Sequence, residues 1–179
     1  MDIDGLSYAR IQQLLGADFV HDFADLYDVT VEQLVSLERF AHKSAENLVS
    51  AISTSKQQPL SRLLFGLGIR HVGAQAAQLL ARHFGSMDAL IAATPEQLGA
   101  VRGIGDIIAA SVADYVGNPT SRALIERLRA RGLTMTEPQA IAADGPLTGS
   151  TVVITGTLPT LSRGEATVAV EQAGGRVTS

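Results

Sequence analysis

The stretch that decides the fold is VRGIGDIIAA, residues Val101–Ala110. It lies between two segments, TPEQLGAV and DIIAASVADYV, whose apolar residues recur with the period of a helix. Gly103 can adopt the positive φ that closes a tight turn, and Ile104 is placed to fill the gap between the two helices. Gly105 then opens the second helix. The stretch therefore predicts a helical hairpin with glycines at its turn.

The same hairpin recurs three more times along the chain. If Gly105 is the anchor of the repeat, the earlier anchors are Gly73, Ala41 and Ser7, at intervals of 32, 32 and 34 residues. The residue before each anchor is apolar, and the residues four and seven positions after it are small or apolar. The chain is therefore expected to be mainly α, with four tandem helical hairpins.

The segments that lead into two of the hairpins carry helix-start signals. Thr30 with Gln33, and Thr94 with Gln97, fit a capping box, in which the hydroxyl accepts an amide proton and the glutamine reaches back. Pro95 suits a first helical position, where its missing N–H leaves no bond unmade. These signals predict helices that begin directly after Thr30 and Thr94.

A glycine anchor leaves the first backbone amides of the second helix uncovered. Those amides have no acceptor inside the helix and carry the positive end of its dipole, so a phosphate can sit on them. Glycine-containing hairpins are also common in proteins that bind no nucleic acid, but four copies in register favour DNA. The predicted DNA-binding residues are Arg70, His71, Val72, Gly73, Ala74, Arg102, Gly103, Ile104, Gly105 and Asp106.

Charge limits how DNA would be held. The net charge is −4, and residues 1–60 carry nine acidic side chains against four basic ones. Residues 61–135 carry eight arginines against five acidic side chains. A nucleic-acid interface usually leaves a basic footprint, and only the middle of the chain has a weak one. Contact with DNA is therefore expected to be local and made mostly by the backbone.

The glycine pattern resembles the helix-hairpin-helix DNA-binding motif. Four such motifs in tandem, with LGIRHVG at Leu67–Gly73 in the third, resemble the C-terminal region of the bacterial NAD-dependent DNA ligases. The segments MDIDGL and LIERLRARGL fit the same family, and the resemblance covers residues 1–135. It implies a fragment that grips nicked duplex DNA through phosphates and the minor groove, without reading sequence. The remaining ligase domains are the implied partners in cis.

The end of the chain resembles the start of a BRCT domain, which follows the hairpins in these ligases. Residues 136–146 read as a linker, and residues 147–179 as a truncated α/β segment with a strand at 151–155 and a helix at 162–175. This segment is too short to enclose a core, so the chain is expected to stop within the domain. The resemblance suggests a phosphate site at Thr155, Gly156 and Arg163.

The first two hairpins depart from the pattern, because neither has glycine at its anchor. They supply weaker DNA-binding candidates, and Arg39 reads equally as a phosphate contact or a surface charge. The arginines at 127, 129 and 131 are expected to lie on a solvated helix, outside any hairpin. The weaker candidates are Gly5, Ser7, Arg39, Ala41 and Lys43.

Catalytic chemistry is absent from the sequence. The ligase nucleophile lies in a Lys-x-Asp-Gly motif, and neither of the two lysines, Lys43 and Lys56, is followed by that pattern. There is no cysteine, and the four histidines lack metal-ligand spacing. The fragment is expected to bind no cofactor and to be inactive alone. NAD, a divalent metal such as magnesium and structural zinc are implied only for the parent enzyme.

Two alternatives remain open. The hairpins fit another DNA repair protein, and the acidic first third fits a helical protein-interaction module related to sterile-alpha-motif bundles. The sequence contains no run of about 18 apolar residues, so no membrane-spanning helix is predicted. The first residues do not have the pattern of a signal peptide. The expected location is the bacterial cytoplasm, at the nucleoid.

Overall fold

The computed structural model divides into two units, Met1–Glu137 and Pro138–Ser179, each considered by itself. It describes residues 1, 3–38, 40–138, 146–147, 150–155, 166–167, 169–170 and 173–178. Among these residues, no helix is both long and apolar enough to cross a membrane.

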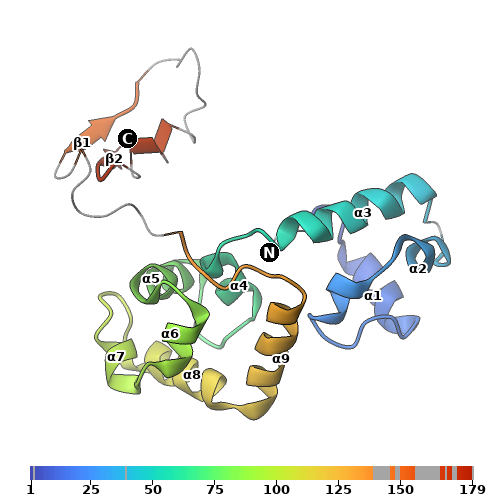
Figure 1. Cartoon of the computed structure of the whole chain (residues 1–179), viewed down its shortest axis with the longest axis horizontal. Helices are drawn as coiled ribbons and strands as arrows, with labels where there is room; N and C mark the ends of the chain where they lie inside the picture. Colours follow the sequence, from blue (N-terminus) through green and yellow to red (C-terminus); the bar gives the residue numbers. More distant parts are fainter. Residues whose placement is uncertain are drawn as a thin grey trace. The chain divides into compact units, whose positions relative to one another are not determined.

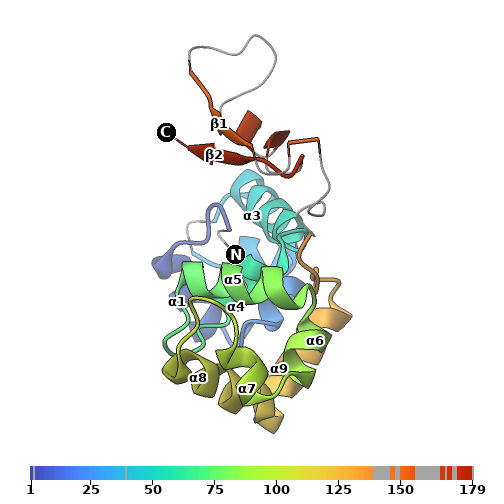
Figure 2. The ribbon, with the colours of Figure 1, turned by 90° about the vertical axis from the view of Figure 1, so that its left-hand side faces the viewer.

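The first unit is helical, as the repeats predict (Figure 1). Figures 1 and 2 both show α4 beside α5 and α7 beside α8, which are the helix pairs of the third and fourth hairpins. Its elements are α1 (Tyr8–Gly16), the 3-10 helix η1 (Asp25–Asp28), α2 (Val31–Val35), α3 (His42–Ser55), α4 (Leu60–Gly66), α5 (Ala74–Phe84), α6 (Met87–Ala92), α7 (Pro95–Gly99), α8 (Asp106–Gly117) and α9 (Pro119–Ala130).

All four hairpins share two backbone hydrogen bonds, which confirms the register of the repeat. The residue before each anchor donates its N–H to the carbonyl three residues earlier, at 2.9–3.4 Å. The carbonyl of each anchor accepts from the N–H four residues later, which starts the second helix, at 2.9–3.0 Å. The pairs are Leu6–Ile3, Phe40–Leu37, Val72–Ile69 and Ile104–Val101 for the turn, and Ile11–Ser7, Ala45–Ala41, Ala77–Gly73 and Ala109–Gly105 for the helix.

Both predicted capping boxes are present. Thr30 and Gln33 exchange side-chain and backbone hydrogen bonds at 2.9 and 3.3 Å, and so do Thr94 and Gln97. Pro95 is the first residue of α7. These helices therefore begin where the sequence places their starts.

Two apolar cores hold the unit together. The first lies under hairpins one and two and includes Leu14, Leu34 and Leu48, each at most 1% exposed. The second lies under hairpins three and four and extends to α6 and α9. Burying one such leucine contributes about 1.5–3 kcal/mol relative to leaving it exposed. The alanines four residues after the anchors are buried too, which lets paired helices approach closely: Ala45, Ala77 and Ala109.

The first unit extends two residues beyond the predicted boundary at residue 135. The carbonyl of Thr136 accepts from the Leu60 N–H at 3.0 Å. The Glu137 carboxylate accepts from the Ser61 N–H at 2.8 Å and from its hydroxyl at 2.9 Å, so it caps α4. Residues 136 and 137 therefore belong to the helical unit rather than to a linker.

The second unit contains a parallel strand pair, β1 (Thr151–Val153) and β2 (Arg176–Thr178), with Val152 opposite Val177. Helical residues lie between the strands at 166–167 and 169–170. Gly174 ends that stretch with φ of 85°. The strand–helix–strand order is the one that the BRCT resemblance implies for a truncated segment.

Candidate DNA interface

The turn of the third hairpin is built around a buried pair, Ile69 and Val72, which are 4% and 6% exposed. Two residues adopt positive φ there, Gly68 at 66° and His71 at 65°. Left-handed backbone disfavours residues with a side chain, so His71 occupies a position that prefers glycine. Its side chain is exposed.

The turn of the fourth hairpin has the same construction with glycine in place of His71. Gly103 has φ of 91°, and Val101 and Ile104 are each 5% exposed. A Cβ on Gly103 would lie 2.9 Å from the end of the Leu79 side chain of α5, which would have to shift. Glycine is therefore favoured here chiefly by the backbone conformation.

The two turns pack reciprocally. Gly103 of the fourth hairpin lies against Leu79 of α5, and Arg70 and His71 of the third line one hollow with Ser111 of α8. Leu79 and Ser111 each lie six residues after their own anchor. Hairpins three and four therefore form an approximately two-fold pair, with both turns supported by the neighbouring hairpin.

The second helices of hairpins two to four differ from the other helices in how their first turns are capped. Side chains cap the first turns of α1, α2, α6, α7 and α9, and Glu137 caps α4. The helices α3, α5 and α8, which are the second helices of hairpins two to four, begin without a side-chain cap. Their first amides have no acceptor among the described residues. Each uncapped helix follows an anchor of the repeat.

The glycine anchors are open to solvent. Gly73 and Gly105 have φ of −82° and −88°, and a Cβ built on either meets nothing within 4 Å. The adjoining Ala74 and Asp106 are exposed. The carboxylate of Asp106 lies 3.8 Å from the Cβ position of Gly99, at the end of α7. A ligand can therefore approach both sets of amides directly.

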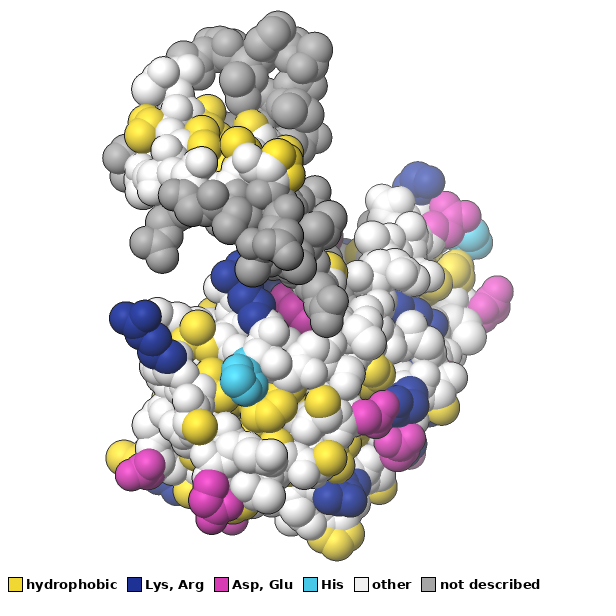
Figure 3. Space-filling view, turned by 60° about the vertical axis from the view of Figure 1, so that its left-hand side comes forward, with side chains coloured by type: hydrophobic (Ala, Val, Ile, Leu, Met, Phe, Trp, Pro, Cys, Tyr) yellow, Lys and Arg dark blue, Asp and Glu magenta, His cyan; other side chains and the backbone are white. Residues whose placement is uncertain are grey.

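Cations stand beside these anchors. Arg70 and Arg102 are exposed, and neither forms an ion pair within the part of the chain that the structure describes. On the face in Figure 3, basic and acidic side chains are interspersed. This distribution fits the expectation that contact is local and relies on backbone amides.

The weaker DNA-binding candidates of the first two hairpins lie in different surroundings from those of hairpins three and four. Gly5 has φ of 77°, but the Ser7 hydroxyl accepts from the Arg10 N–H and so covers the start of α1. Ala41 leaves α3 uncapped, yet the Lys43 ammonium lies 3.4 Å from the Glu46 carboxylate. Arg39 lies outside the described residues.

The tail candidates are only partly described. Thr155 lies two residues after β1 and is exposed. Gly156 and Arg163 lie outside the described residues. A phosphate site in this segment therefore stays a prediction.

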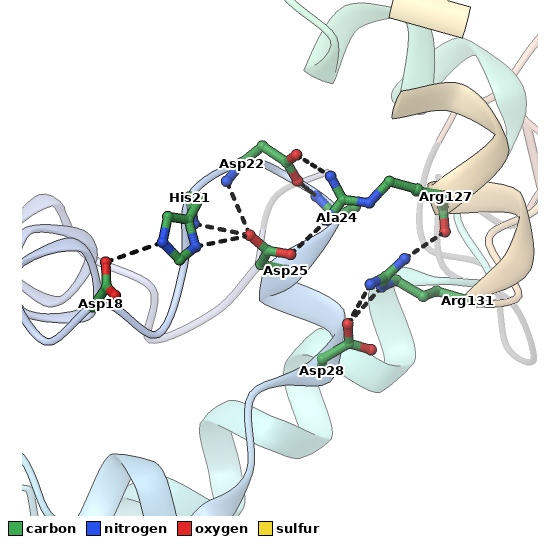
Figure 4. A network of polar contacts seen from close by, with 8 residues as sticks. All are labelled: Asp18, His21, Asp22, Ala24, Asp25, Asp28, Arg127 and Arg131. Atoms are coloured by element: carbon green, nitrogen blue, oxygen red, sulfur yellow. Dashed lines mark hydrogen bonds and ion pairs between the residues drawn. The ribbon is translucent and has the colours of Figure 1, made fainter. Parts of the chain in front are cut away.

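The expectation that the arginines of α9 are merely solvated is wrong. Arg127 forms ion pairs with Asp22 and with Asp25, the latter at 2.6 Å, and Arg131 donates from Nε to Asp28 at 2.8 Å (Figure 4). The aspartates at 22, 25 and 28 and the arginines at 127, 129 and 131 are regularly spaced, but neither spacing indicates a partner. Residues over 100 positions apart give no local hint that they pair.

Charge and hydrogen bonding shift the pKa values in this network. The His21 backbone N–H, which donates to Asp25, lowers the pKa of the Asp25 carboxyl, and the Asp22 N–H and Arg127 act in the same direction. A hydrogen bond to Asp22 raises the pKa of the Arg127 guanidinium. Both groups are therefore charged at neutral pH.

No cluster of three His, Cys, Asp or Glu side chains suited to a metal occurs among the described residues. The two lysines are placed away from the hairpin amides of α5 and α8: Lys43 beside Glu46 on α3, and Lys56 with its ammonium 5.8 Å from the Tyr27 ring centre.

Comparison with known proteins agrees with this geometry. Residues 1–54 match a family described as a SAM-like helix-hairpin-helix tandem, and residues 62–125 match the helix-hairpin-helix motif family. The chain is 76% identical over its full length to a DNA ligase from Gemmatimonas aurantiaca, of which it covers 26%. It is 50% identical to a DNA ligase from Lysinibacillus sphaericus and 49% identical to one from Bacillus thuringiensis, aligning over 99% of its length with 27% of each. The chain therefore carries tandem helix-hairpin-helix motifs and is similar along its length to about a quarter of the length of these DNA ligases.

Proposed function

We propose that this chain is the part of a DNA ligase that grips the backbone of nicked duplex DNA. One observation carries the proposal: the second helices of hairpins three and four begin at open glycines without a side-chain cap. Both glycines are exposed, and so are Arg70 and Arg102, which precede them by three residues in the chain. Phosphate is the ligand in DNA that suits uncovered helix amides and a neighbouring guanidinium.

The two-fold pairing of hairpins three and four suits a duplex. Two amide clusters related in this way can hold phosphates on both strands across the minor groove. Contacts to phosphate position a protein without reading sequence, which suits an enzyme that must accept any nick. The bound duplex would then be held for the catalytic domain of the longer protein.

The reaction itself belongs to the longer protein. NAD, a divalent metal such as magnesium and structural zinc are implied for it by the family resemblance. The chain has no cysteine to hold structural zinc, and neither lysine lies in the adenylylation motif that reacts with NAD. Alone, the chain is expected to seal no nick. A cytoplasmic location at the nucleoid follows from the same proposal.

Binding to a fluorescently labelled nicked duplex, measured by anisotropy across a salt series, tests the grip. The variant carries Gly73→Asp together with Gly105→Asp, so that a carboxylate takes the place of each phosphate. Aspartate is a good N-cap residue and a Cβ fits at both positions, so the variant should fold. Each lost charge-assisted hydrogen bond is worth about 1.5–3 kcal/mol, which predicts a loss of affinity of roughly 100-fold or more.

Two controls define the outcome. Gly73→Ala with Gly105→Ala leaves the amides uncovered and should bind nearly as the parent does. Gly117→Asp adds the same charge to the opposite end of α8, where a Cβ also has space, and should change affinity little. If the double aspartate variant binds like the parent, the amides are not the grip. If even the parent fails to bind, a protein-interaction function replaces DNA binding.

A further inference from the structure

The two hairpin pairs are joined by a set of ion pairs, here called the clamp: Asp22, Asp25 and Asp28 with Arg127 and Arg131. The aspartates lie in and beside η1, between the helices of the first pair. The arginines lie on α9, whose Ile125 and Leu128 are buried in the second core. The clamp therefore links one pair to the other (Figure 4).

Three of the five side chains of the clamp, those of Asp22, Asp25 and Arg131, also form hydrogen bonds with the backbone. Asp25 accepts from the backbone N–H of His21 at 2.9 Å and from that of Asp22 at 3.3 Å. The Asp22 carboxylate accepts from the Ala24 N–H at 2.8 Å. Arg131 donates from Nη1 to the Arg127 carbonyl at 3.0 Å. These backbone hydrogen bonds restrict the three side chains, so less side-chain entropy is lost when their ion pairs form.

Apolar packing at the same joint is incomplete. A hollow of about 380 Å³ lies between the pairs, lined from the first side by Leu6 and Phe23 and from the second by Leu63 and Leu128. Phe23 is 51% exposed there. Beside the hollow, Ala24 of the first pair is fully buried in the second core, and Tyr27 packs against both cores. These few apolar contacts and the charges of the clamp therefore act together on the angle between the pairs.

We propose that the clamp is a positioning device that sets the angle between the first and second hairpin pairs, so that both can meet one duplex. The role of the clamp in binding DNA rests on the proposed function, whereas its effect on the angle between the two pairs does not. A pair on the same helix supplies the control: Arg129 binds Asp88 of α6 through two nitrogens, one at 3.0 Å, and both residues belong to the second pair. Losing that ion pair removes one positive charge from the same helix, against two in a double variant of the clamp, without freeing the joint.

The experiment measures the angle directly. The chain has no cysteine, so Ser50→Cys on α3 and Ala110→Cys on α8, both exposed, accept spin labels without further change. The distance distribution between the labels is recorded by pulsed electron resonance in the full chain. Arg127→Gln with Arg131→Gln should broaden or shift the distribution, whereas Arg129→Gln should leave it as in the parent. Exchanging one pair, Asp28→Arg with Arg131→Asp, should keep it narrow.

The outcomes separate the clamp from the grip. An unchanged distribution in the double glutamine variant overturns the clamp, and so does equal broadening in Arg129→Gln. Affinity for nicked duplex, measured on the same proteins, should fall about five- to tenfold in the double variant if one molecule in five to ten keeps the competent angle. A changed distribution with unchanged affinity would keep the clamp and reject its role in the grip.

Discussion

Hairpin pairs one–two and three–four share a backbone but differ at the positions that face solvent. Both close their turns with the same hydrogen bond and start their second helices with the same one. The anchors are Ser7 and Ala41 in the first pair, and open glycines in the second. The difference teaches that the repeat specifies the fold, whereas the anchor residue decides what lies at the helix amides: a capping hydroxyl at Ser7, a methyl group at Ala41 and no side chain at the two glycines.

Charge follows the same division. In the first pair, Arg10 donates to the Gly5 carbonyl at 2.9 Å and lies over the Phe40 ring, and Lys43 lies beside Glu46. These cations are occupied by neighbouring groups of their own pair. In the second pair, Arg70 and Arg102 stand beside the glycine anchors without an ion pair in the described part of the chain. The second pair is therefore the better prepared to receive phosphate.

The largest contrast should come from placing aspartate at the anchors of each pair in turn. Ser7→Asp with Ala41→Asp should lower affinity for nicked duplex by less than about threefold, since the Ser7 hydroxyl already covers the α1 amides and the cation at the start of α3, Lys43, already lies beside Glu46. Gly73→Asp with Gly105→Asp should lower it by roughly 100-fold or more, through the loss of two charge-assisted hydrogen bonds. Anisotropy titrations at one salt concentration make the comparison. Equal losses in both variants would show that the two pairs share the grip.

Substitutions where the paired helices meet should lower the free energy of unfolding by similar amounts in the two pairs. Ala45 and Ala77 are both fully buried four residues after an anchor, so Ala45→Leu and Ala77→Leu each insert a side chain where two helices meet. Overpacking of this kind lowers the free energy of unfolding by about 1–3 kcal/mol. Urea denaturation of the two variants should give similar losses. A loss in only one pair would mean that the repeats differ in packing as well as in surface.

These shared features are the ones that the sequence predicts. Anchors, capping boxes and buried alanines follow from local hydrogen bonding and helical periodicity, which a short window of sequence records. The equivalence of His71 with Gly103 was visible from the register of the repeat, and both take positive φ.

Features that depend on contact between distant segments were missed. Arg127 and Arg131 read as solvated because their aspartates lie over 100 positions earlier. The predicted boundary at residue 135 lies two residues too early, because the Glu137 carboxylate caps α4 at Ser61, 76 residues before it in the chain. Neither contact changes the local pattern of apolar and polar residues, so sequence reasoning had no basis for them.

Salt dependence should distinguish the arginines of the two pairs. Each cation that meets a phosphate contributes about −0.9 to the slope of log affinity against log salt concentration. Arg70→Gln with Arg102→Gln should therefore make the slope shallower by about 2 and weaken binding severalfold. Lys43→Gln, from the first pair, should leave the slope unchanged. If Lys43→Gln changed the slope and the double arginine variant did not, the electrostatic contact with DNA would lie in the first pair.

The smallest expected effect is the response of the joint between the pairs to acid. The pKa of Asp25 is lowered in the folded protein, below its ordinary value of 3.8, so its charged form favours the folded arrangement. That contribution is fully present above the ordinary carboxyl pKa and is lost as pH falls through the lowered one. The groups around Asp25 are the His21 ring at 3.5 Å, the Asp22 carboxylate and the Arg127 guanidinium.

The distance between labels on α3 and α8 should therefore be the same at pH 7 and pH 5 and should broaden only below the ordinary carboxyl range. Asp25→Asn removes the titrating group and should broaden the distribution already at pH 7, with a weaker response to acid. If the distance distribution of the parent broadened between pH 7 and pH 5, a titrating group other than Asp25 would control the joint. A distribution that stays narrow in acid while the helices remain folded would mean that apolar contacts around the hollow hold the two pairs together without the charges.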